Sequence, residues 1–486
     1  MNPTIEQCAI REATLSTSAN LIISARAGAA KTTTLILISE ALPHTDILAI
    51  AFNKKIADEL QQRLPDNADA ATMNALGHRA WKSFLGKHLK VDGRKNYFLL
   101  REIIQELPTD EREICFTDFS DLLESVRTAK QEGYMPGKLH PSARPLISDE
   151  SFFELLDFIP LPVHIEVVNE FMRRNFERAM QGQIDFDDQI YCSALMPCSF
   201  PSPSLTLIDE AQDLSHINHV LLRKIVKRKR LIAVGDECQA IYGFRGASDN
   251  SMSELRDAHD MQELSLTICF RSSQAVVENA RWRAPDMQFR EGAPAGEVRR
   301  IQFWSSNDIA DGDAIICRNN APLFSMAIAL IKAGRNPELS SGDIVAQIEK
   351  VMKKLGPASR TRDEALLALE SHMEELRKKK KHKARLDDLE DCIKVLLRQG
   401  ETLGQALAFF QAILARAGRI KLLTGHKSKG LEFDRVWFLD RHLLSDEGQD
   451  RNVKYVIETR ARESLFYVDS SGFEDGDNPA PPAYGS

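Results

Sequence analysis

The sequence has no closely spaced cysteine pair, no long apolar run and no excess of positive charge. Its eight cysteines are scattered without a C-x-x-C pair, so neither a disulfide framework nor a zinc site is indicated, and we expect buried thiols. No charge-free apolar run approaches the ~18 residues of a membrane helix, and the first residues, MNPTIEQ, do not resemble a signal peptide. These absences predict a cytoplasmic chain without a membrane partner.

The formal net charge of −7 provides no general attraction to nucleic acid, so any such contact has to come from local groups. With 486 residues the chain is long enough for several domains, and its 43% hydrophobic and 27% charged content is ordinary for a globular protein. Composition therefore neither supports nor excludes DNA binding. We find no internal repeat.

The stretch 24–35, SARAGAAKTTTL, lies between the apolar runs 21–23 and 35–38. This pattern predicts a buried strand, a loop of small residues and a helix that begins near Lys31. Backbone N–H groups at a helix start can bind phosphate, a lysine can reach the outer phosphates, and a threonine hydroxyl can ligate Mg²⁺. Lys31 and Thr32 are assigned to these last two roles. The predicted nucleotide-binding residues are Ala27, Gly28, Ala29, Ala30, Lys31, Thr32 and Thr33.

Ala30 stands where the pattern G-x-x-x-x-G-K-[ST] has glycine, and Ala25 occupies the first glycine position. If position 30 needs a left-handed backbone, alanine there costs roughly 1–2 kcal/mol. If it does not, the methyl group only narrows the space beside the phosphates. The alternative to a nucleotide site is an ordinary strand-to-helix turn.

The second apolar strand with chemistry at its end is SLTLIDEAQD, residues 204–213. ATP hydrolysis needs a carboxylate that holds Mg²⁺ and a polar group that orients the attacking water. We assign Asp209 to the metal and Glu210 to the water. An Asp-Glu pair after a strand is by itself most often a solvated corner, but together with Lys31 and Thr32 it predicts a site for ATP and Mg²⁺.

Further motifs follow in a fixed order between Gln7 and Arg462. They read EQCAI, ARAGAAKTT, AFNKKIADEL, FDDQI, LIDEAQD, VGDECQAIYGFRGA, FRSS, TGHKSKGLEF and ETRARESL. In this order they resemble the superfamily-one DNA helicases of the UvrD/Rep class, with some similarity to F-box DNA helicases. The resemblance implies an α/β fold with two RecA-like P-loop NTPase domains, each interrupted by a helical insertion.

Helical periodicity from about 95 to 180 and from 338 to 415 fits these two insertions. The implied segments are 1–88 and 184–262 for domain 1A, 89–183 for insertion 1B, 263–337 and 417–470 for domain 2A, 338–416 for a short insertion 2B, and 471–486 for a disordered tail.

The resemblance also implies roles around ATP. Gln7 matches the residue that reads the adenine edge, and Phe270 the aromatic ring on its face. Arg271 and Arg460 match two catalytic arginines at the γ-phosphate, where ATP would join the two α/β units. Gln239 matches the catalytic γ-phosphate sensor, and Glu432 the ribose contact. Taken singly, each residue could instead be a surface, core or ion-paired residue.

On the DNA side the resemblance implies base stacking by aromatic residues next to polar and basic groups. The predicted DNA-binding residues are Phe52, Asn53, Lys54, Thr72, Tyr242, Phe244, Arg245 and His426. Core packing is the alternative for the aromatic residues. The family usually has T-F-H-S-L where this chain has TMNAL at 72–76, so Thr72 is the best candidate there. The basic run 377–385 is either a duplex contact or, more simply, a solvated face.

These assignments predict an ATP- and Mg²⁺-dependent helicase that moves in the three-prime to five-prime direction on single-stranded DNA and acts at single-strand/double-strand junctions. The short insertions leave open a DNA-stimulated ATPase that strips proteins, or that gates a partner nuclease in repair or in defence against phage. Ala30 leaves open a non-catalytic scaffold that binds nucleotide and DNA.

Overall fold

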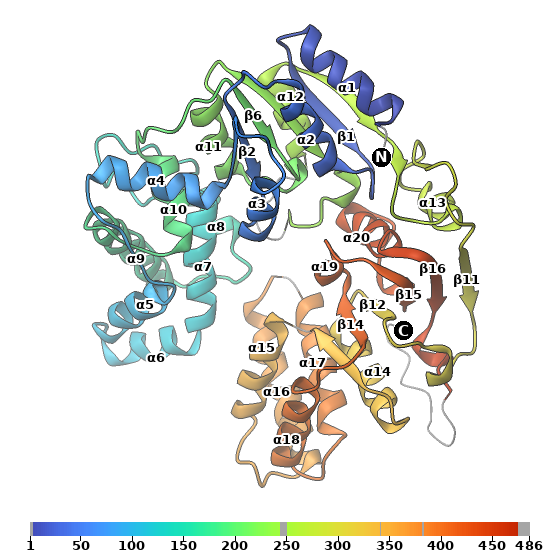
Figure 1. The fold of residues 1–486 in the computed structure, drawn as a ribbon. Helices are drawn as coiled ribbons and strands as arrows, with labels where there is room; N and C mark the ends of the chain where they lie inside the picture. Colours follow the sequence, from blue (N-terminus) through green and yellow to red (C-terminus); the bar gives the residue numbers. More distant parts are fainter. Residues whose placement is uncertain (1–2, 244–249, 341, 382, 475–486) are drawn as a thin grey trace. The chain divides into compact units, whose positions relative to one another are not determined.

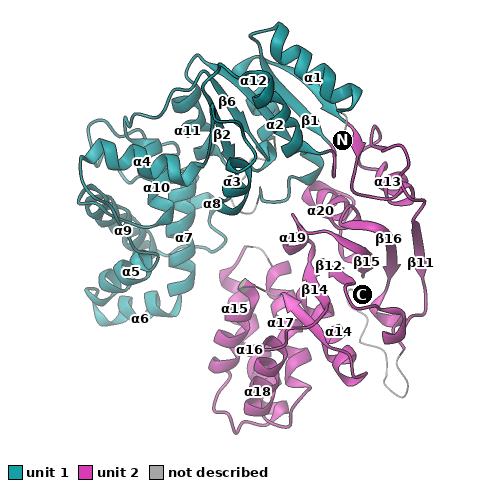
Figure 2. Cartoon of the chain, viewed as in Figure 1, with its two compact units in different colours: residues 1–25, 30–266 teal, residues 26–29, 267–486 magenta. Residues whose placement is uncertain are grey.

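The computed structural model describes residues 3–243, 250–340, 342–381 and 383–474 (Figure 1). The chain forms two compact units, coloured in Figure 2. Unit 1 comprises Met1–Ala25 and Ala30–Leu266, and unit 2 comprises Arg26–Ala29 and Thr267–Ser486. Each unit contains a parallel six-stranded sheet with helices, which confirms the predicted α/β class.

The sheet of unit 1 has the strand order β3-β2-β6-β7-β1-β8, and all neighbouring strands are parallel. The strands are β1 (Asn20–Ala25), β2 (Ile47–Ala51), β3 (Ala68–Thr72), β6 (Leu205–Ile208), β7 (Arg230–Gly235) and β8 (Met261–Leu266). Parallel strands bring all their carboxyl ends to one edge, where open α/β sheets bind ligands. The segments that follow β1, β6 and β7 therefore lie next to one another, and those that follow β2 and β3 continue the same edge.

Helices connect these strands, as parallel pairing requires. They are α1 (Ile5–Ser16), α2 (Lys31–Ala41), α3 (Lys54–Gln61), α4 (Met73–Leu85), α10 (Phe186–Leu195), α11 (His216–Val226) and α12 (Ser251–His259), with the 3₁₀ turns η1 (Ala211–Asp213) and η2 (Glu237–Gln239). Helix α2 begins at Lys31, as the sequence predicts.

Between α4 and α10 the chain forms a helical segment. Its elements are α5 (Lys95–Gln105), α6 (Thr109–Thr117), α7 (Phe119–Gln131), α8 (Asp149–Leu155) and α9 (Pro162–Met180), with the short paired strands β4 (Lys90–Val91) and β5 (Gln183–Ile184). One hydrophobic cluster contains Ile22 and Ile50 of the sheet, Trp81 of α4 and Phe171 of α9. The helical segment and the sheet thus share a core.

A buried ion-pair network also joins this segment to α10. Lys130 lies 2.7 Å from Asp185 and 2.8 Å from Asp188, and Lys95 lies 2.7 Å from Asp188. Each of the four side chains is at most 5% exposed. Burial by itself raises the pKa of Asp188, but the ammonium groups of Lys130 and Lys95 outweigh it and hold this pKa well below its usual range. The FDDQI motif therefore holds α5, α7 and α10 together.

The sheet of unit 2 has the order β11-β16-β15-β12-β14-β13 and is also parallel. Its strands are β11 (Glu297–Ile301), β12 (Ala314–Cys317), β13 (Pro337–Ser340), β14 (Ile420–Thr424), β15 (Phe433–Leu439) and β16 (Ala461–Val468), and β9 (Ile268–Cys269) pairs separately with β10 (Gln288–Phe289). The helices include α13 (Gln274–Ala280), α14 (Asn320–Lys332), α19 (Gly425–Ser428) and α20 (Gly448–Glu458), with the 3₁₀ turns η4 (Ser306–Asp308), η5 (Arg441–Leu443) and η6 (Ser470–Gly472).

A second helical segment lies between β13 and β14. It contains α15 (Asp343–Lys354), α16 (Arg362–Lys379), α17 (Ala384–Leu397) and α18 (Leu403–Leu414). Arg377, at the start of the basic run, lies 2.6 Å from Asp387 and 2.5 Å from Glu390, so its guanidinium is already paired.

Three further observations bear on the sequence-based expectations. Seven cysteines are buried thiols, whereas Cys8 is exposed because it lies on the outer face of α1. The predicted tail begins with defined structure, since the Trp304 amide donates to the carbonyl of Gly472 at 3.0 Å. Among the residues in the described ranges, no helix is both long enough and apolar enough to cross a membrane.

Candidate functional site

The loop after β1 reaches α2 through a left-handed residue. Ala30 has φ 56° and ψ 42° and occupies the N-cap position of α2 without a side-chain cap. Its carbonyl accepts a hydrogen bond from the amide of Thr34 at 3.0 Å, which closes the first turn of the helix. Of the two alternatives for Ala30, the left-handed backbone is therefore the one observed. Gly28 in the same loop also has a positive φ, 72°, and Thr33 is exposed in the first turn.

The residues that follow β6 meet the start of α2. The Lys31 ammonium donates to Glu210 Oε2 at 2.7 Å, and the Thr32 hydroxyl donates to Asp209 Oδ2 at 3.2 Å. Burial lowers the pKa of Lys31, but the carboxylates around it outweigh this effect and the pKa is raised. Burial and the charge of Glu210 raise the pKa of Asp209 to about 6. Four residues predicted from two distant motifs thus form one cluster.

The cluster can hold a magnesium ion. The Thr32 hydroxyl and the Asp209 carboxylate offer two neighbouring hard oxygen ligands, which is the chemistry that Mg²⁺ prefers. Mg²⁺ usually keeps several waters and completes its shell with substrate phosphates, so two protein ligands suffice. The donor set therefore fits the metal that ATP chemistry requires.

Glu210 has an unusual backbone. Its φ is 54°, a left-handed value that is uncommon for a residue other than glycine. Its carboxylate Oε2 also accepts a hydrogen bond from Gln212 Nε2 at 2.6 Å. Backbone strain of this kind concentrates at functional sites. The left-handed turn points the carboxylate of Glu210 toward Lys31.

Two residues near this cluster, Asp236 and Gln212, were not among the predicted site residues. Gln239 Nε2 donates to Asp236 Oδ2 at 2.6 Å, and the Asp236 amide donates to Gln212 Oε1 at 2.9 Å. Asp236 and Gln212 thus link the predicted sensor Gln239 to the segment that carries Glu210. The signal was available, because Asp236 follows β7 as Asp209 follows β6. A rule that reads polar residues at every strand end would have found it.

Gln7 is buried and already hydrogen-bonded. Its Oε1 accepts from the Thr4 amide at 3.0 Å, and its Nε2 donates to the Thr34 hydroxyl at 3.2 Å. It is therefore part of the capping box of α1 and tethers this helix to α2. Its predicted contact with adenine stays a prediction.

Two of the predicted base-stacking residues meet in unit 1. Phe52, which follows β2, is 51% exposed, and its ring stacks on Tyr242 at a centroid distance of 6.1 Å and an angle of 6°. An aromatic ring buried for packing would not present half of its surface to solvent, so exposure favours a binding role for Phe52 over the core alternative. Phe244 and Arg245 lie outside the described residues.

The other polar candidates on this edge have local structural roles as well. Asn53 and Thr72 are N-caps of α3 and α4, and each side chain accepts the amide three residues ahead, at 2.9 and 3.1 Å. Lys54 is exposed. Phe186, at the start of α10, was not singled out by the sequence analysis; it is 61% exposed, and its carbonyl accepts from Asn74 Nδ2 at 2.9 Å. It adds an aromatic surface beside α4.

In unit 2 the two predicted catalytic arginines, Arg271 and Arg460, donate hydrogen bonds to other residues of the same unit. Arg271 Nε donates to Glu432 Oε1 at 2.7 Å, so the predicted phosphate and ribose residues pair with each other. Arg460 is 1% exposed, and its guanidinium donates to the carbonyls of Val456 at 2.9 Å and Leu431 at 3.3 Å. A role for Arg460 at a phosphate therefore requires these bonds to be exchanged.

Phe270 and His426 are each partly buried in unit 2. Phe270 follows β9, and His426 lies in α19, directly after β14. Their assigned contacts with adenine and DNA stay predictions.

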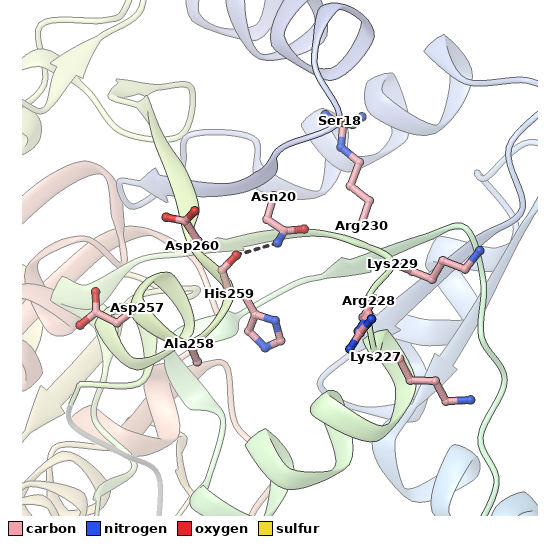
Figure 3. Close-up of a pocket in the computed structure, with 10 residues that line it drawn as sticks. All are labelled: Ser18, Asn20, Lys227, Arg228, Lys229, Arg230, Asp257, Ala258, His259 and Asp260. Carbon is pink, nitrogen blue, oxygen red and sulfur yellow. Dashed lines mark hydrogen bonds between the residues drawn. The ribbon is translucent and has the colours of Figure 1, made fainter.

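A cavity of about 430 Å³ opens at the other edge of the first sheet (Figure 3). It lies where β1, β7 and β8 begin, and Asn20 Nδ2 donates there to the carbonyl of His259 at 2.6 Å. Three consecutive exposed basic residues, 227–229, line it. The motif residues lie after the carboxyl ends of the strands, whereas this cavity lies at their amino ends. The cavity is therefore not part of the candidate nucleotide site.

Comparison with known proteins shows which families the chain is similar to. A family model described as an AAA domain matches residues 7–245. DNA helicase II of Escherichia coli (strain K12) is 23% identical over 378 residues, which cover 66% of this chain and 49% of that protein. The ATP-dependent DNA helicase UvrD1 of Mycobacterium tuberculosis (strain ATCC 25618 / H37Rv) is 26% identical over 315 residues, 58% of this chain and 38% of that protein.

F-box DNA helicase protein 1 of Schizosaccharomyces pombe (strain 972 / ATCC 24843) is 23% identical over 534 residues, which cover 96% of this chain and 57% of that protein. The chain thus spans about half the length of the curated relatives it matches. The match to the F-box DNA helicase includes both α/β units, because it covers 96% of this chain. They confirm the resemblance of the chain to the UvrD/Rep-like superfamily-one DNA helicases.

Proposed function

We propose that the chain is an ATP-dependent DNA motor, a helicase or translocase driven by hydrolysis of Mg-ATP. The observation that carries this proposal is the cluster formed by Lys31, Thr32, Asp209 and Glu210 at the carboxyl edge of the first sheet. Its four side chains supply the phosphate contact, the metal ligands and the acid that phosphoryl transfer to water requires. The printed names of the relatives, which are DNA helicases, support DNA as the polymer.

The geometry suggests how the site changes when it binds ATP. Without a phosphate nearby, the Lys31 ammonium is paired with Glu210. A γ-phosphate carries more charge than a carboxylate and would compete for Lys31, which frees the Glu210 carboxylate to accept a proton from water. Mg²⁺ held by Thr32 and Asp209 would neutralise part of the negative charge of the phosphates. When Lys31 exchanges Glu210 for the γ-phosphate, the same step would bind ATP and free Glu210 to act as the general base.

The finer assignments belong to the same proposal. Arg271 and Arg460 would contact the γ-phosphate, Gln239 would sense it, and Gln7, Phe270 and Glu432 would hold the nucleoside. Single-stranded DNA would stack on Phe52 and Tyr242, and Phe186 would extend this surface. Movement would run in the three-prime to five-prime direction, as the family resemblance implies.

The test is an ATPase titration of the purified chain with single-stranded DNA, duplex DNA and RNA. We expect single-stranded DNA to stimulate turnover most, and we expect Lys31→Ala and Glu210→Gln to abolish it. Lys229→Ala is the matched control, since it removes an exposed lysine at the other edge of the sheet. The proposal is wrong if single-stranded DNA has no effect or if Lys31→Ala turns over like wild type.

A second candidate is a DNA-stimulated ATPase that translocates with little unwinding and acts on bound proteins or a partner nuclease. The short helical insertions predicted from the sequence favour it, because the family resemblance assigns engagement of duplex DNA to these insertions. A strand-displacement assay on duplexes with a three-prime or a five-prime tail separates the two. Robust unwinding of the three-prime-tailed duplex supports the helicase, and ATP turnover without unwinding supports the second candidate.

A further inference from the structure

The carboxyl edge of the second sheet carries a group of ligand atoms that the ATP motor does not use. Asp440 follows β15, His442 lies in η5, and Asp469 follows β16, the neighbouring parallel strand. One potential ligand atom from each residue lies within 4.8 Å of the other two. Glu432 and Arg460, by contrast, precede these same strands and lie at the amino edge. The group is therefore distinct from the residues assigned to ATP.

Asp440 shows why this group differs from an ordinary surface cluster. Its side chain is 1% exposed, and its Oδ1 accepts from the amide and the hydroxyl of Ser470 at 2.7 and 3.1 Å. Its Oδ2 is buried and accepts no hydrogen bond. Within the described part of the chain, no lysine or arginine forms an ion pair with Asp440 or Asp469. A buried carboxylate oxygen without a partner is destabilising and calls for an explanation.

The contact between the two exposed residues, His442 and Asp469, does not explain the unpaired oxygen of Asp440. His442 Nδ1 lies 3.5 Å from Asp469 Oδ1, and the two side chains are 49% and 63% exposed. A surface pair of this kind contributes little to stability and leaves Asp440 Oδ2 unsatisfied. A cation between the three side chains would satisfy all of them at once. Asp440 also has a left-handed backbone, φ 50°, so its position is imposed by the fold.

We propose that Asp440, His442 and Asp469 form a binding site for a divalent transition-metal ion, Zn²⁺ or Mn²⁺. Imidazole and carboxylate groups are both ligands that such ions accept, whereas Mg²⁺ and Ca²⁺ prefer oxygen ligands alone. Metal–ligand bonds of about 2.0–2.2 Å would draw ligand atoms that lie within 4.8 Å of one another onto a single ion, and the two exposed side chains can move toward it.

The bound ion would join the ends of β15 and β16. Asp469 and Ser470 lead into Phe473, which packs edge-on against Trp304 at 4.9 Å. The metal would therefore stabilise the final described turn of the chain against the sheet. This is a structural role, and it is independent of whether the motor hydrolyses ATP.

The experiment uses full-length protein, stripped of metal and free of nucleotide, in equilibrium dialysis against Zn²⁺ and in thermal melts. We expect about one Zn²⁺ per chain that is absent from the triple variant Asp440→Asn, His442→Ala, Asp469→Asn. Loss of a residue that only orients a metal ligand typically lowers metal affinity by about tenfold or more, and loss of a ligand itself should cost at least as much. Each of His442→Ala and Asp469→Asn should therefore weaken Zn²⁺ binding by about tenfold or more. Saturating Zn²⁺ should raise the Tm of wild type by roughly 5–10 °C, and Mg²⁺ should not.

Two controls make the test specific. Asp311→Asn removes a carboxylate that is 58% exposed, close to the 63% of Asp469, and should bind Zn²⁺ like wild type. Asp209→Asn removes the predicted Mg²⁺ ligand and should also retain this Zn²⁺. The triple variant corrects for zinc bound elsewhere, for example at the exposed Cys8. Equal binding by wild type and the triple variant, or an equal Tm shift with Mg²⁺, would overturn the proposal.

If Asp440→Asn fails to fold, the two exposed substitutions still decide the question. Their side chains are largely in solvent, so the fold tolerates them. Wild-type affinity in both would refute the site.

Discussion

Replacing Ala30 by glycine should stabilise unit 1, although glycine usually weakens the start of a helix. Ala30 has φ 56° and ψ 42°. A side chain in this left-handed region costs about 1–2 kcal/mol, whereas the greater freedom of glycine in the unfolded chain costs roughly 0.5–1 kcal/mol. The difference predicts a gain of about 1 kcal/mol in the free energy of unfolding, or a rise of roughly 2–4 °C in Tm.

The assay is equilibrium urea unfolding of Ala30→Gly beside Ala9→Gly. Ala9 is exposed in the middle of α1 with an ordinary helical backbone, so the same chemical change there should lower stability by about 1 kcal/mol. Opposite signs at the two positions are the expected result. If Ala30→Gly destabilises the protein as Ala9→Gly does, the left-handed backbone at position 30 is not what limits the loop.

ATP turnover of Ala30→Gly then separates two effects of the methyl group. Relief of backbone strain alone leaves turnover unchanged. A large gain would show that the methyl group also hinders the phosphates. This distinction decides whether the departure from the glycine pattern affects ATP turnover.

Three further predictions concern unit 1. Lys130→Ala should lower the free energy of unfolding by roughly 3–5 kcal/mol, because it leaves buried carboxylates unpaired, whereas loss of the exposed Lys55 should change it by less than about 0.5 kcal/mol. The pKa of Asp188 is well below its usual range, so its contribution is present above pH ~4 and should be lost as the pH falls below that value. Phe52→Ala should weaken binding of single-stranded DNA by roughly 5- to 150-fold, and Phe303→Ala should not.

Each of these has a measurement that can contradict it. Urea titrations of the two lysine variants should differ in midpoint, and equal midpoints would mean that the buried network is relaxed by water. Urea titrations across pH 3 to 6 should show a steeper loss in wild type than in Asp188→Asn; parallel curves would assign the acid sensitivity to other groups. Fluorescence anisotropy with an oligonucleotide measures the DNA contact, and unchanged affinity in Phe52→Ala would exclude it.

Much of the candidate site could be predicted from the sequence because its residues follow buried strands. Asp209 and Glu210 come directly after β6, and Lys31 follows β1 after a short loop of small residues. Parallel strands bring such positions to one edge whatever the rest of the chain does. The helix start at Lys31 was predictable for the same reason. Both predictions follow from the local pattern of apolar and polar residues and from the rule that parallel strands place their carboxyl ends at one edge.

Partners within the site were not predictable in this way. The pairing of Lys31 with Glu210, and of Arg271 with Glu432, depends on distances between side chains from distant segments. The backbone at Ala30 was left open because alanine can adopt either conformation, and only the surrounding loop decides between them. The group at Asp440, His442 and Asp469 was missed because its ligands come from two strand ends that the sequence separates by 28 residues of other structure.

The shared core of unit 1 also sets how this unit can come apart. Since Ile22, Trp81 and Phe171 belong to one hydrophobic cluster, the helical segment cannot melt or swing away without exposing the underside of the sheet that carries Lys31. Amide hydrogen exchange should therefore report one cooperative block, in which α9 and β1 lose protection together. A displacement of these helices would reach the loop that precedes Lys31 through packed side chains.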